Sequence, residues 1–329
     1  MQAQTRRDDA GSDGRYRIVG LLGAGGMGTV VDAIDTRDGR RVALKFARIR
    51  TDEPAGEVQQ LLVEANAMTR ARSPHVCEVF GVTTCEGRPC LAMERLSGRT
   101  LRCRRAREPL AIEAVVGLGL QLTYALERVH GAGLVHQDIK PANIFVTSTG
   151  LIKLLDFGTA IWLGDGTAGL GERPADSSVL GTSNYIAPER ILRRPPDPRS
   201  DLFSLGAVLY EMVTGRQPFA GTSPADVLFN VLDAHPLPLR AHVPDCPVGL
   251  DHTVRKLLAR RLDRRFQSAF DLRRALWRLR DQASARRVVV TGVPGRQSMQ
   301  SRERRPIPPN GPGFDHDAAL ALGHVAGCV

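Results

Sequence analysis

The chain of 329 residues has no hydrophobic run long enough to cross a bilayer. Its longest uncharged apolar stretch, residues 114–126, contains Gln121 and falls short of the roughly 20 apolar residues that a spanning helix needs. The N-terminus, MQAQTRRDDAGSDG, has positive charge but no apolar segment behind it, so it does not resemble a secretory signal. The sequence therefore predicts a cytoplasmic protein with no membrane partner.

Paired cysteines are also missing. The chain contains neither a C-x-x-C pair nor a Cys/His spacing of the zinc type. We therefore predict reduced thiols and no zinc site. The six cysteines are Cys77, Cys85, Cys90, Cys103, Cys246 and Cys328.

Lysine is scarce: of 45 basic residues only four are Lys, and the other 41 are Arg. A compact ammonium on a flexible stem does work that a planar guanidinium cannot, so we expect Lys where that shape is required. The four are Lys45, Lys140, Lys153 and Lys256.

The net charge of +10 would suit nucleic-acid binding, but it is spread along the chain. The densest basic run, residues 99–107, lacks the interleaved aromatic residues typical of such a surface. We therefore predict no nucleic-acid partner. A hydrophobic content of 42% and a charged content of 24% exclude a mainly disordered or fibrous chain.

The first third of the chain has the pattern of a small sheet with one helix. Residues 16–46 alternate with period two around a glycine cluster and an Asp38-Gly39 turn, which predicts three antiparallel strands. Residues 76–82 and 89–94 resemble two further strands. Residues 55–72 have helical spacing of apolar side chains. The apolar residues at this spacing are Val58, Leu61, Leu62, Ala65 and Met68.

From residue 110 the periodicity becomes mainly helical, with segments 111–130, 202–214, 250–262 and 268–280. Beyond about Gln282 the chain is rich in Pro, Gly and Arg, which predicts a disordered tail. We expect an α+β protein with a disordered N-terminus at 1–14, a folded domain at 15–281 and the tail at 282–329.

Gly23, Gly25 and Gly28 have the spacing G-x-G-x-x-G, which alone is a weak signal shared with dinucleotide-binding turns. A dinucleotide-binding turn opens a helix, whereas residues 29–34 continue in strand rhythm. The glycines therefore indicate a hairpin whose backbone N–H groups can approach phosphates.

Four further motifs follow in order. Lys45 ends the run VALK on the next strand, and Glu64 on the following helix could pair with it. The segment VHQDIKPAN places Asp138 and Asn143 five residues apart, and Pro141 between them precludes a regular helix. Asp156-Phe157-Gly158 follows an apolar strand at 151–155, and Ala187-Pro188-Glu189 comes later.

This ordered set resembles the eukaryotic-type protein kinases, and most closely the bacterial Ser/Thr members. The resemblance covers about residues 15–280. It implies the bilobal kinase fold, with a small antiparallel-sheet lobe carrying one helix at 15–94 and a larger, mainly helical lobe at 97–281. It also implies an ATP-dependent enzyme, with Mg²⁺ or alternatively Mn²⁺ as cofactor, that phosphorylates Ser and Thr of protein substrates and autophosphorylates in signal transduction.

The same resemblance assigns residues. Asp138 would take the acceptor proton, Lys140 would neutralise the moving phosphoryl group, and Glu64 would fix Lys45 on the phosphates. Asn143 and Asp156 would hold the metal. The ATP-binding set would be Leu22, Gly23, Ala24, Gly25, Gly26, Met27, Gly28, Val30, Ala43, Lys45, Met93 as gatekeeper, Glu94, Leu96 and Phe145.

Support residues are implied as well. Glu189 would pair with Arg265, although Arg264 is adjacent, and Asp201 would brace the catalytic loop. Met68, Val79, His136 and Phe157 would stack into an internal apolar column. Thr182 would contact Asp138 and Lys140, in the pattern of the Ser/Thr branch.

The chain departs from the family pattern at Gln137, where most relatives have Arg between the motif His and Asp. That Arg commonly binds a phosphate on the activation segment. Because Gln137 is neutral, we expect phosphorylation of this segment to affect activity less, unless a nearby Arg173 or Arg190 compensates. The candidate phosphorylation sites are Thr167, Ser177, Ser178, Thr182 and Ser183.

Two rival hypotheses remain. A pseudokinase scaffold would normally lack Lys45, Asp138 or Asp156, and all three are present. A small-molecule phosphotransferase usually lacks the full glycine loop and the APE segment.

Receptor kinases of bacteria often continue into a membrane span and a sensor domain. This chain ends at Val329 with neither, so we expect a cytosolic input, while dimerisation through the N-terminal lobe stays open.

Overall fold

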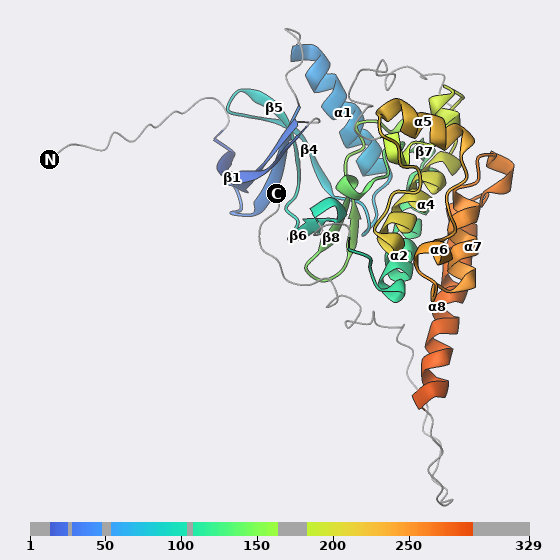
Figure 1. The fold of residues 1–329 in the computed structure, drawn as a ribbon. Helices are drawn as coiled ribbons and strands as arrows, with labels where there is room; N and C mark the ends of the chain where they lie inside the picture. The colour runs from blue at the N-terminus through green and yellow to red at the C-terminus, as the bar shows by residue number, and fades with distance from the viewer. Residues whose placement is uncertain (1–13, 26–27, 48–53, 104–107, 164–182, 292–329) are drawn as a thin grey trace, which may run out of the picture.

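The structure is a computed structural model that describes residues 14–25, 28–47, 54–103, 108–163 and 183–291. A sheet with one helix, drawn in blue in Figure 1, stands beside a larger helical region drawn in green to orange. The two-lobed α+β architecture expected from the sequence is confirmed.

The small lobe is a five-stranded antiparallel sheet in the order β1-β2-β3-β5-β4. The three strands expected over residues 16–46 are confirmed. The fourth begins later than the sequence suggests, because Val76 forms an isolated parallel bridge to Leu154 in the large lobe instead. The strands are β1 (Tyr16–Gly25), β2 (Gly28–Asp35), β3 (Arg41–Phe46), β4 (Val79–Cys85) and β5 (Arg88–Glu94).

Strand β3 divides its side chains between two faces of the sheet, because successive residues of a strand point in opposite directions. Val42, Leu44 and Phe46 join a small core on one face with residues of β1, β2, β4 and β5. Ala43 and Lys45 therefore point to the other face, which is covered by α1. The alternation places a charged side chain between the sheet and the helix.

Helix α1 (Pro54–Arg70) packs on β4 and β5. Of the apolar residues at helical spacing, Leu61, Ala65 and Met68 are buried. Val58 and Leu62 are 37% and 42% exposed. The sheet covers only a narrow stripe of the helix, and Glu64 occupies some of that stripe, being 2% exposed.

The large lobe is built around α2 (Ile112–Gly131) and α4 (Arg199–Thr214), with α7 (Val248–Leu257) and α8 (Ala269–Thr291) packed on them. Residues 200–214 of α4 are all buried, so α4 forms the centre of this lobe. Helix α8 continues past residue 280, where the periodicity predicted its end. Residues 282–291 form the last part of this helix, so the prediction of a disordered tail from residue 282 is wrong there. Residues 292–329, the rest of the predicted tail, lie outside the described residues.

Helix α7 ends at Leu257, five residues before the end that the periodicity predicts. The side chain of Arg265 explains the early end. Its guanidinium donates to the backbone carbonyls of Ala259 and Arg260 at 2.7 and 3.0 Å, so these carbonyls do not need helical N–H partners.

Several short elements were not predicted, because each has too few residues to establish a period. Helix α5 does carry a local signal: Ser223 and Asp226 form a reciprocal capping box at its start. These elements are β6 (Gly98–Thr100), β7 (Leu134–Val135), β8 (Ile144–Thr147), β10 (Ile161–Trp162), α3 (Pro188–Ile191), α5 (Pro224–Asp233) and α6 (Leu239–His242), with 3₁₀ turns η1 (Leu101–Cys103), η3 (Pro141–Asn143), η5 (Ser183–Tyr185) and η6 (Leu262–Arg264). The strand expected at residues 151–155 is confirmed as β9 (Ile152–Leu154).

The hairpin of β8 and β9 positions the motif residues of the large lobe. Residues 136–143 precede β8, and Asp156 follows β9 by two residues, so pairing of the two strands brings both loops to one end of the hairpin. No helix within the described ranges is both long enough and apolar enough to span a membrane.

The crossing of α4 and α7 generates a stability prediction. A Cβ on Gly206 would lie 2.6 Å from Leu257 Cβ and 3.3 Å from Leu258 Cδ2. We expect Gly206→Ala to lower the free energy of unfolding by about 1–3 kcal/mol through overpacking, measured by urea unfolding. Gly117 in α2 is the matched control, since nothing lies within 4 Å of its added Cβ. Gly117→Ala should be neutral or stabilise by about 0.5–1 kcal/mol. Equal effects of the two variants would contradict this account.

Candidate active site

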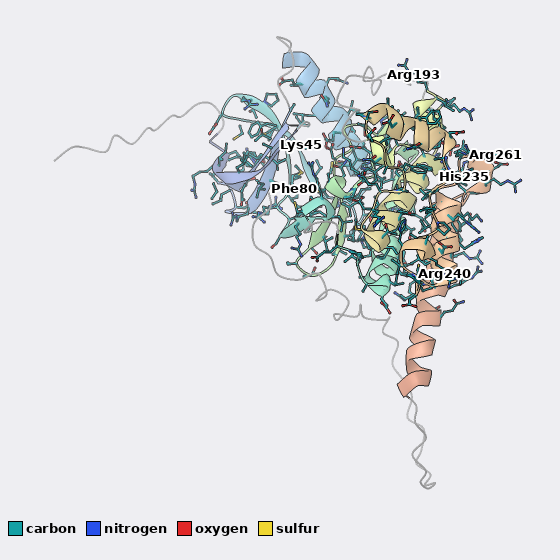
Figure 2. All side chains as sticks on the ribbon, in the orientation of Figure 1. Lys45, Phe80, Arg193, His235, Arg240 and Arg261 are labelled. Atoms are coloured by element: carbon teal, nitrogen blue, oxygen red, sulfur yellow. The ribbon has the colours of Figure 1, made fainter. Side chains whose placement is uncertain are left out.

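The ammonium of Lys45 lies between two carboxylates from different regions of the chain. It donates to Glu64 Oε1 and Oε2 at 2.6 and 2.9 Å, and to Asp156 Oδ1 at 3.0 Å. Figure 2 shows Lys45 on the small-lobe sheet, next to α1 and the large lobe. One side chain thus joins β3, α1 and the loop after β9, as the motif spacing predicted for Lys45 and Glu64.

These charges influence one another strongly because they are buried. Burial by itself lowers the pKa of Lys45, but the charges of Asp156 and Glu64 outweigh it, so the pKa of Lys45 is raised. Burial raises the pKa of Glu64, although Lys45 opposes that change. For Asp156, burial is outweighed by Lys45, which holds the pKa of that carboxyl below its usual value. Lys45 is therefore a cation, and Asp156 a carboxylate, at neutral pH.

Asp138, Lys140 and Asn143 form a second charged group on the loop before β8. Lys140 Nζ lies 2.7 Å from Asp138 Oδ2. The amide nitrogen of Asn143 donates to both the backbone oxygen and Oδ2 of Asp138 at 2.9 Å. Burial raises the pKa of Asp138 against the opposing charge of Lys140. The Asp138 carboxylate is thus held in one orientation by two neighbours from its own loop.

Asp201 braces this loop from α4. Its carboxylate is fully buried and accepts from the backbone N–H of His136 at 2.9 Å and of Gln137 at 2.8 Å. His130 Nε2 lies 2.9 Å from Asp201 Oδ2. Burial would raise the pKa of Asp201, but the His130 contact and these hydrogen bonds reverse the effect and lower it. A carboxylate with a lowered pKa is a permanent acceptor for the loop backbone at neutral pH.

His136 and Phe157, two residues of the predicted apolar column, contact each other. Their rings are 4.7 Å apart in an edge-to-face arrangement, and both residues are fully buried. Met68 is also buried, and Val79 is partly buried against the same core. Residues from α1, β4 and two loops of the large lobe therefore belong to one packed cluster.

The glycine segment forms the hairpin that the sequence predicts. Gly25 pairs with Gly28, and Gly23 pairs with Val30, so the tip lies between β1 and β2. Gly28 has φ 129°, a conformation that other residues rarely adopt. Leu22 and Ala24 lie on the β1 arm of this hairpin. Gly26 and Met27 lie outside the described residues.

Strand pairing places the predicted adenine contacts on one face of the sheet. Val30 pairs with Lys45 and Ala43 pairs with Met93, so these four side chains share the face that carries the ammonium. Phe145 lies on β8 of the large lobe, and Glu94 and Leu96 lie on the connection between the lobes, at the end of β5 or just beyond it.

The predicted activation-segment residues Thr167, Arg173, Ser177, Ser178 and Thr182 lie outside the described residues, as does the side chain of Ser183. The end of that segment is described. Glu189 accepts from Arg265 Nη1 and Nη2 at 2.7 and 2.8 Å, and from Ser200 Oγ at 2.6 Å. The guanidinium belongs to Arg265 rather than to Arg264, which is exposed. This buried pair fixes α3 to the loop before α8.

The donor set fits Mg²⁺, which takes hard oxygen ligands and usually only one or two carboxylates besides phosphates. Asn143 uses its amide nitrogen on Asp138, which leaves its carbonyl oxygen available to a metal. The Asp156 carboxylate adds a negatively charged oxygen donor to this set. Within the described ranges, no cluster of three or more His, Cys, Asp or Glu side chains could hold a metal alone.

Sequence reasoning assigned no role to Lys153, although the scarcity of lysine pointed to it. Its Nζ lies 2.5 Å from Glu94 Oε1 and also donates to Val76 O at 3.4 Å. The same carboxylate oxygen accepts from the backbone N–H of Glu78 at 2.7 Å. Lys153 therefore ties the segment between the lobes to β9 of the large lobe.

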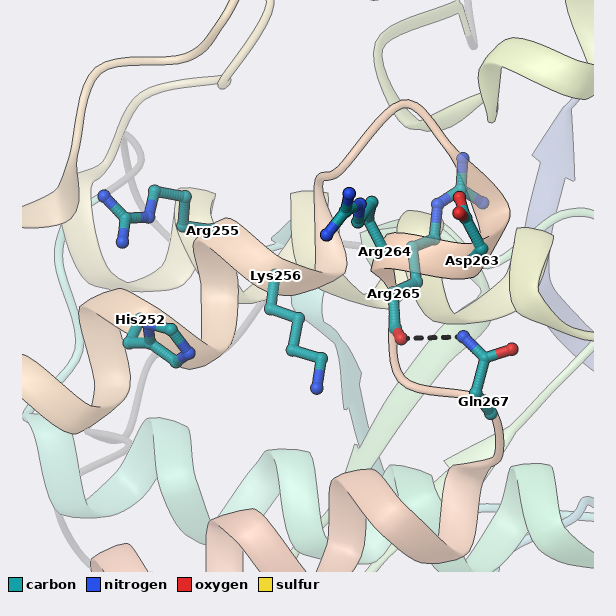
Figure 3. A pocket seen from close by; sticks show the side chains of 7 residues that line it. All are labelled: His252, Arg255, Lys256, Asp263, Arg264, Arg265 and Gln267. Atoms are coloured by element: carbon teal, nitrogen blue, oxygen red, sulfur yellow. Dashed lines mark hydrogen bonds between the residues drawn. The ribbon is translucent and has the colours of Figure 1, made fainter.

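A hollow of about 520 Å³ lies elsewhere on the large lobe (Figure 3). The side chain of Arg265 is committed to Glu189, and that of Gln267 donates to the backbone oxygen of Arg265. None of Lys45, Asp138, Asn143 and Asp156 lines this hollow, so it is separate from the charged groups described above. It is lined by His252, Arg255, Lys256, Asp263, Arg264, Arg265 and Gln267.

Comparison with known proteins agrees with this arrangement. A family model described as a protein kinase domain matches residues 16–269. The chain is 34% identical over 275 residues to a probable serine/threonine-protein kinase PknB of Corynebacterium glutamicum, covering 80% of this chain and 42% of that protein.

Two further relatives have similar identity. A probable serine/threonine-protein kinase of Streptomyces coelicolor is 36% identical over 265 residues, covering 79% of this chain and 39% of its own length. Serine/threonine-protein kinase PknA of Mycobacterium tuberculosis is 34% identical over 291 residues, covering 86% of this chain and 65% of its own length. The chain thus spans less than half the length of the first two relatives and about two thirds of the third.

The Glu189–Arg265 pair generates a prediction about stability. Removing one partner leaves a buried charge uncompensated, so we expect Glu189→Gln to lower the free energy of unfolding by about 3–5 kcal/mol at pH 7. Glu78→Gln is the matched control, because its pair with Arg72 is exposed and should contribute at most about 1 kcal/mol.

The difference in free energy of unfolding between wild type and Glu189→Gln depends on pH through the pKa of Glu189. Burial opposes ionisation of Glu189, but Arg265 and Ser200 outweigh it and lower the pKa in the folded protein. The stabilisation is therefore complete above the unfolded pKa of about 4.3 and is lost as pH falls through the lower, folded value. Urea unfolding at pH 7 and pH 3.5 should show the gap between wild type and Glu189→Gln narrowing in acid. A gap that widens in acid would refute the argument.

Proposed function

The chain belongs to the protein kinase family, and on that premise we propose that it transfers the γ-phosphoryl group of ATP to Ser and Thr hydroxyls of proteins. The observation that supports this most directly is the convergence of three segments on one site. Lys45 bonds Glu64 and Asp156, and Asp138 is held beside Lys140 and Asn143. Phosphoryl transfer needs little covalent chemistry from the protein and depends on positioning and charge, which this arrangement supplies.

The nucleotide would bind between the glycine hairpin and β8. Backbone N–H groups of the hairpin would approach the phosphates, and the Lys45 ammonium would bind the α- and β-phosphates while Glu64 holds it in place. Val30, Ala43 and Phe145 would enclose the adenine ring, with Met93 behind it. The backbone of Glu94 and Leu96 would meet the polar edge of the adenine.

In the transfer step, the acceptor oxygen would bond to the γ-phosphorus as the bond from that phosphorus to the β–γ bridging oxygen breaks. The hydroxyl proton would pass to the Asp138 carboxylate, and ADP would leave with the bridging oxygen. Lys140 would offset the negative charge of the moving phosphoryl group. Burial of Asp138 favours this role, because a carboxylate with a raised pKa is a better proton acceptor.

Asn143 and Asp156 would hold Mg²⁺, or Mn²⁺ in its place. When bound, the metal would neutralise charge on the phosphate oxygens. Asp156 is held ready for this role by Lys45 and by the backbone N–H of Gly158, which donates to Asp156 Oδ1 at 3.2 Å.

Two rival functions are less well supported. A pseudokinase scaffold would keep the fold without the charged groups, yet Lys45, Glu64, Asp138 and Asp156 are all present, and Lys45 contacts both Glu64 and Asp156. A small-molecule phosphotransferase is disfavoured by the complete glycine hairpin and by Glu189 in its APE segment. Incubation with labelled ATP, Mg²⁺ and a generic protein substrate separates the three possibilities.

The kinase domain is proposed to extend over residues 15–281, with lobes at 15–94 and 97–281. Protein substrates are the proposed partners, with no nucleic acid and no membrane. A cytoplasmic location, a role in signal transduction and any dimer through the small lobe rest on sequence reasoning and stay predictions.

Two substitutions test the site assignment. Asp138→Asn should lower turnover by roughly 10²- to 10⁴-fold, because the acceptor hydroxyl loses its proton acceptor. Lys45→Met should nearly abolish transfer. The measurement is the initial rate of ³²P incorporation into a generic protein substrate. Asp263→Asn and Lys256→Met are matched controls outside the site and should keep wild-type rates. Wild-type rates in both site variants would show that the assignment is wrong.

The acceptor type is tested separately. Lys140 lies two residues after Asp138 and contacts it, as in the Ser/Thr branch of the family. Phosphoamino-acid analysis of the autophosphorylated protein should therefore yield phosphoserine and phosphothreonine. Mainly phosphotyrosine would reject this acceptor type while leaving the kinase assignment intact.

A further inference from the structure

The backbone of Gln137, directly before Asp138, has an unusual conformation. Its φ is 70°, in the left-handed region that non-glycine residues seldom occupy. Such a conformation persists only where the surroundings hold it in place. Whatever holds Gln137 also fixes the direction in which the chain enters Asp138.

The side chain of Gln137 does not hold its own backbone. Its Nε2 is buried and has no hydrogen-bond partner within the described region of the chain. The two backbone groups are instead held from outside. The N–H donates to Asp201 Oδ1 at 2.8 Å, and the carbonyl accepts from Arg190 Nη1 at 2.9 Å. Asp201 comes from α4 and Arg190 from α3, so one helix binds the backbone N–H of Gln137 and another binds its carbonyl.

Arg190 has no carboxylate hydrogen bond of its own among the described residues. Three carboxylates influence it electrostatically, namely Asp201, Asp138 and Glu189. Each of these is already engaged: Asp201 by His130 and the loop backbone, Asp138 by Lys140, and Glu189 by Arg265.

Burial lowers the pKa of Arg190, but a guanidinium remains protonated at any physiological pH. Arg190 is therefore a largely buried cation whose guanidinium hydrogen bond, within the described ranges, goes to the Gln137 carbonyl. Removing a guanidinium from water costs free energy. The charge-assisted hydrogen bond to the Gln137 carbonyl offsets part of that cost.

We propose that Arg190 is a positioning residue for phosphoryl transfer, which holds the Gln137 carbonyl and thereby aims Asp138 at the acceptor hydroxyl. Arg190 does not touch the reacting atoms. It acts through the peptide that precedes Asp138. It also supplies a positive charge beside position 137, where this chain has a neutral Gln and most relatives have Arg. This inference rests on the proposed kinase function.

The proposal predicts a specific kinetic defect. Arg190→Ala should lower kcat by about 10- to 100-fold, as expected for a misaimed catalytic group, while KM for ATP changes less than about twofold. The kcat is expressed per site that binds Mg·ADP, measured by calorimetry, so that any unfolded fraction is removed from the comparison. Arg190→Lys, which keeps a cation, should recover some of the loss. Arg194→Ala is the matched control, because Arg194 is exposed and close in sequence.

Chemical rescue separates positioning from packing. Guanidinium chloride at about 20 mM, far below the molar concentrations that unfold proteins, should restore kcat of Arg190→Ala several-fold. Urea at the same concentration should not, and neither reagent should change the wild-type or Arg194→Ala rates. Rescue by guanidinium would support a cation bound at the Gln137 carbonyl.

The outcomes that overturn the proposal are distinct from failure of the kinase function. If the wild-type protein transfers no phosphate, the proposed function fails first. If the wild type is active and Arg190→Ala keeps its kcat per binding site, Arg190 does not position Asp138. If Arg190→Ala loses activity but guanidinium and the Lys variant restore none of it, the role of Arg190 is packing only, and the proposal is rejected.

Discussion

A buried ammonium connects the segments of this protein that must act together. Lys45 lies on β3, Glu64 on α1 and Asp156 on the loop after β9, and hydrogen bonds of 2.6 to 3.0 Å join all three. Two acidic side chains share one ammonium in a buried site, so the positions of α1 and the Asp156 loop depend on each other.

A second buried charge organises the opposite side of the site. Asp201 accepts from two consecutive backbone N–H groups, those of His136 and Gln137, and contacts His130. Asp201 thus holds the backbone at the start of the loop that carries Asp138, Lys140 and Asn143. The Glu189–Arg265 pair has the same role farther from the site, where it joins α3 to the segment before α8. Charged side chains far apart in the sequence thus fix the conformation of loops that lack regular secondary structure.

Much of the fold and of the candidate site could be predicted from the sequence. The strands over residues 16–46 and the long helices have clear periods, and the motif order indicated the pairing of Lys45 with Glu64. The family resemblance implied the pairing of Glu189 with Arg265. The exposure of Val58 and Leu62 could not be predicted, because spacing shows which residues share a helical face but not how much of it the sheet covers. The end of α7 depends on Arg265, a residue eight positions beyond Leu257. The contacts of Arg190 and Lys153 depend on tertiary packing, which has no local signature.

The Lys153–Glu94 pair has a mechanical consequence. The lobes are joined covalently through residues 94–97, and next to that segment the ion pair connects β5 to β9. It adds to the other contacts between the lobes, those of Lys45 with Asp156 and of Val76 with Leu154. Moving β5 away from β9 would pull a largely buried ammonium away from its carboxylate, so the pair opposes separation of the two strands next to the covalent connection.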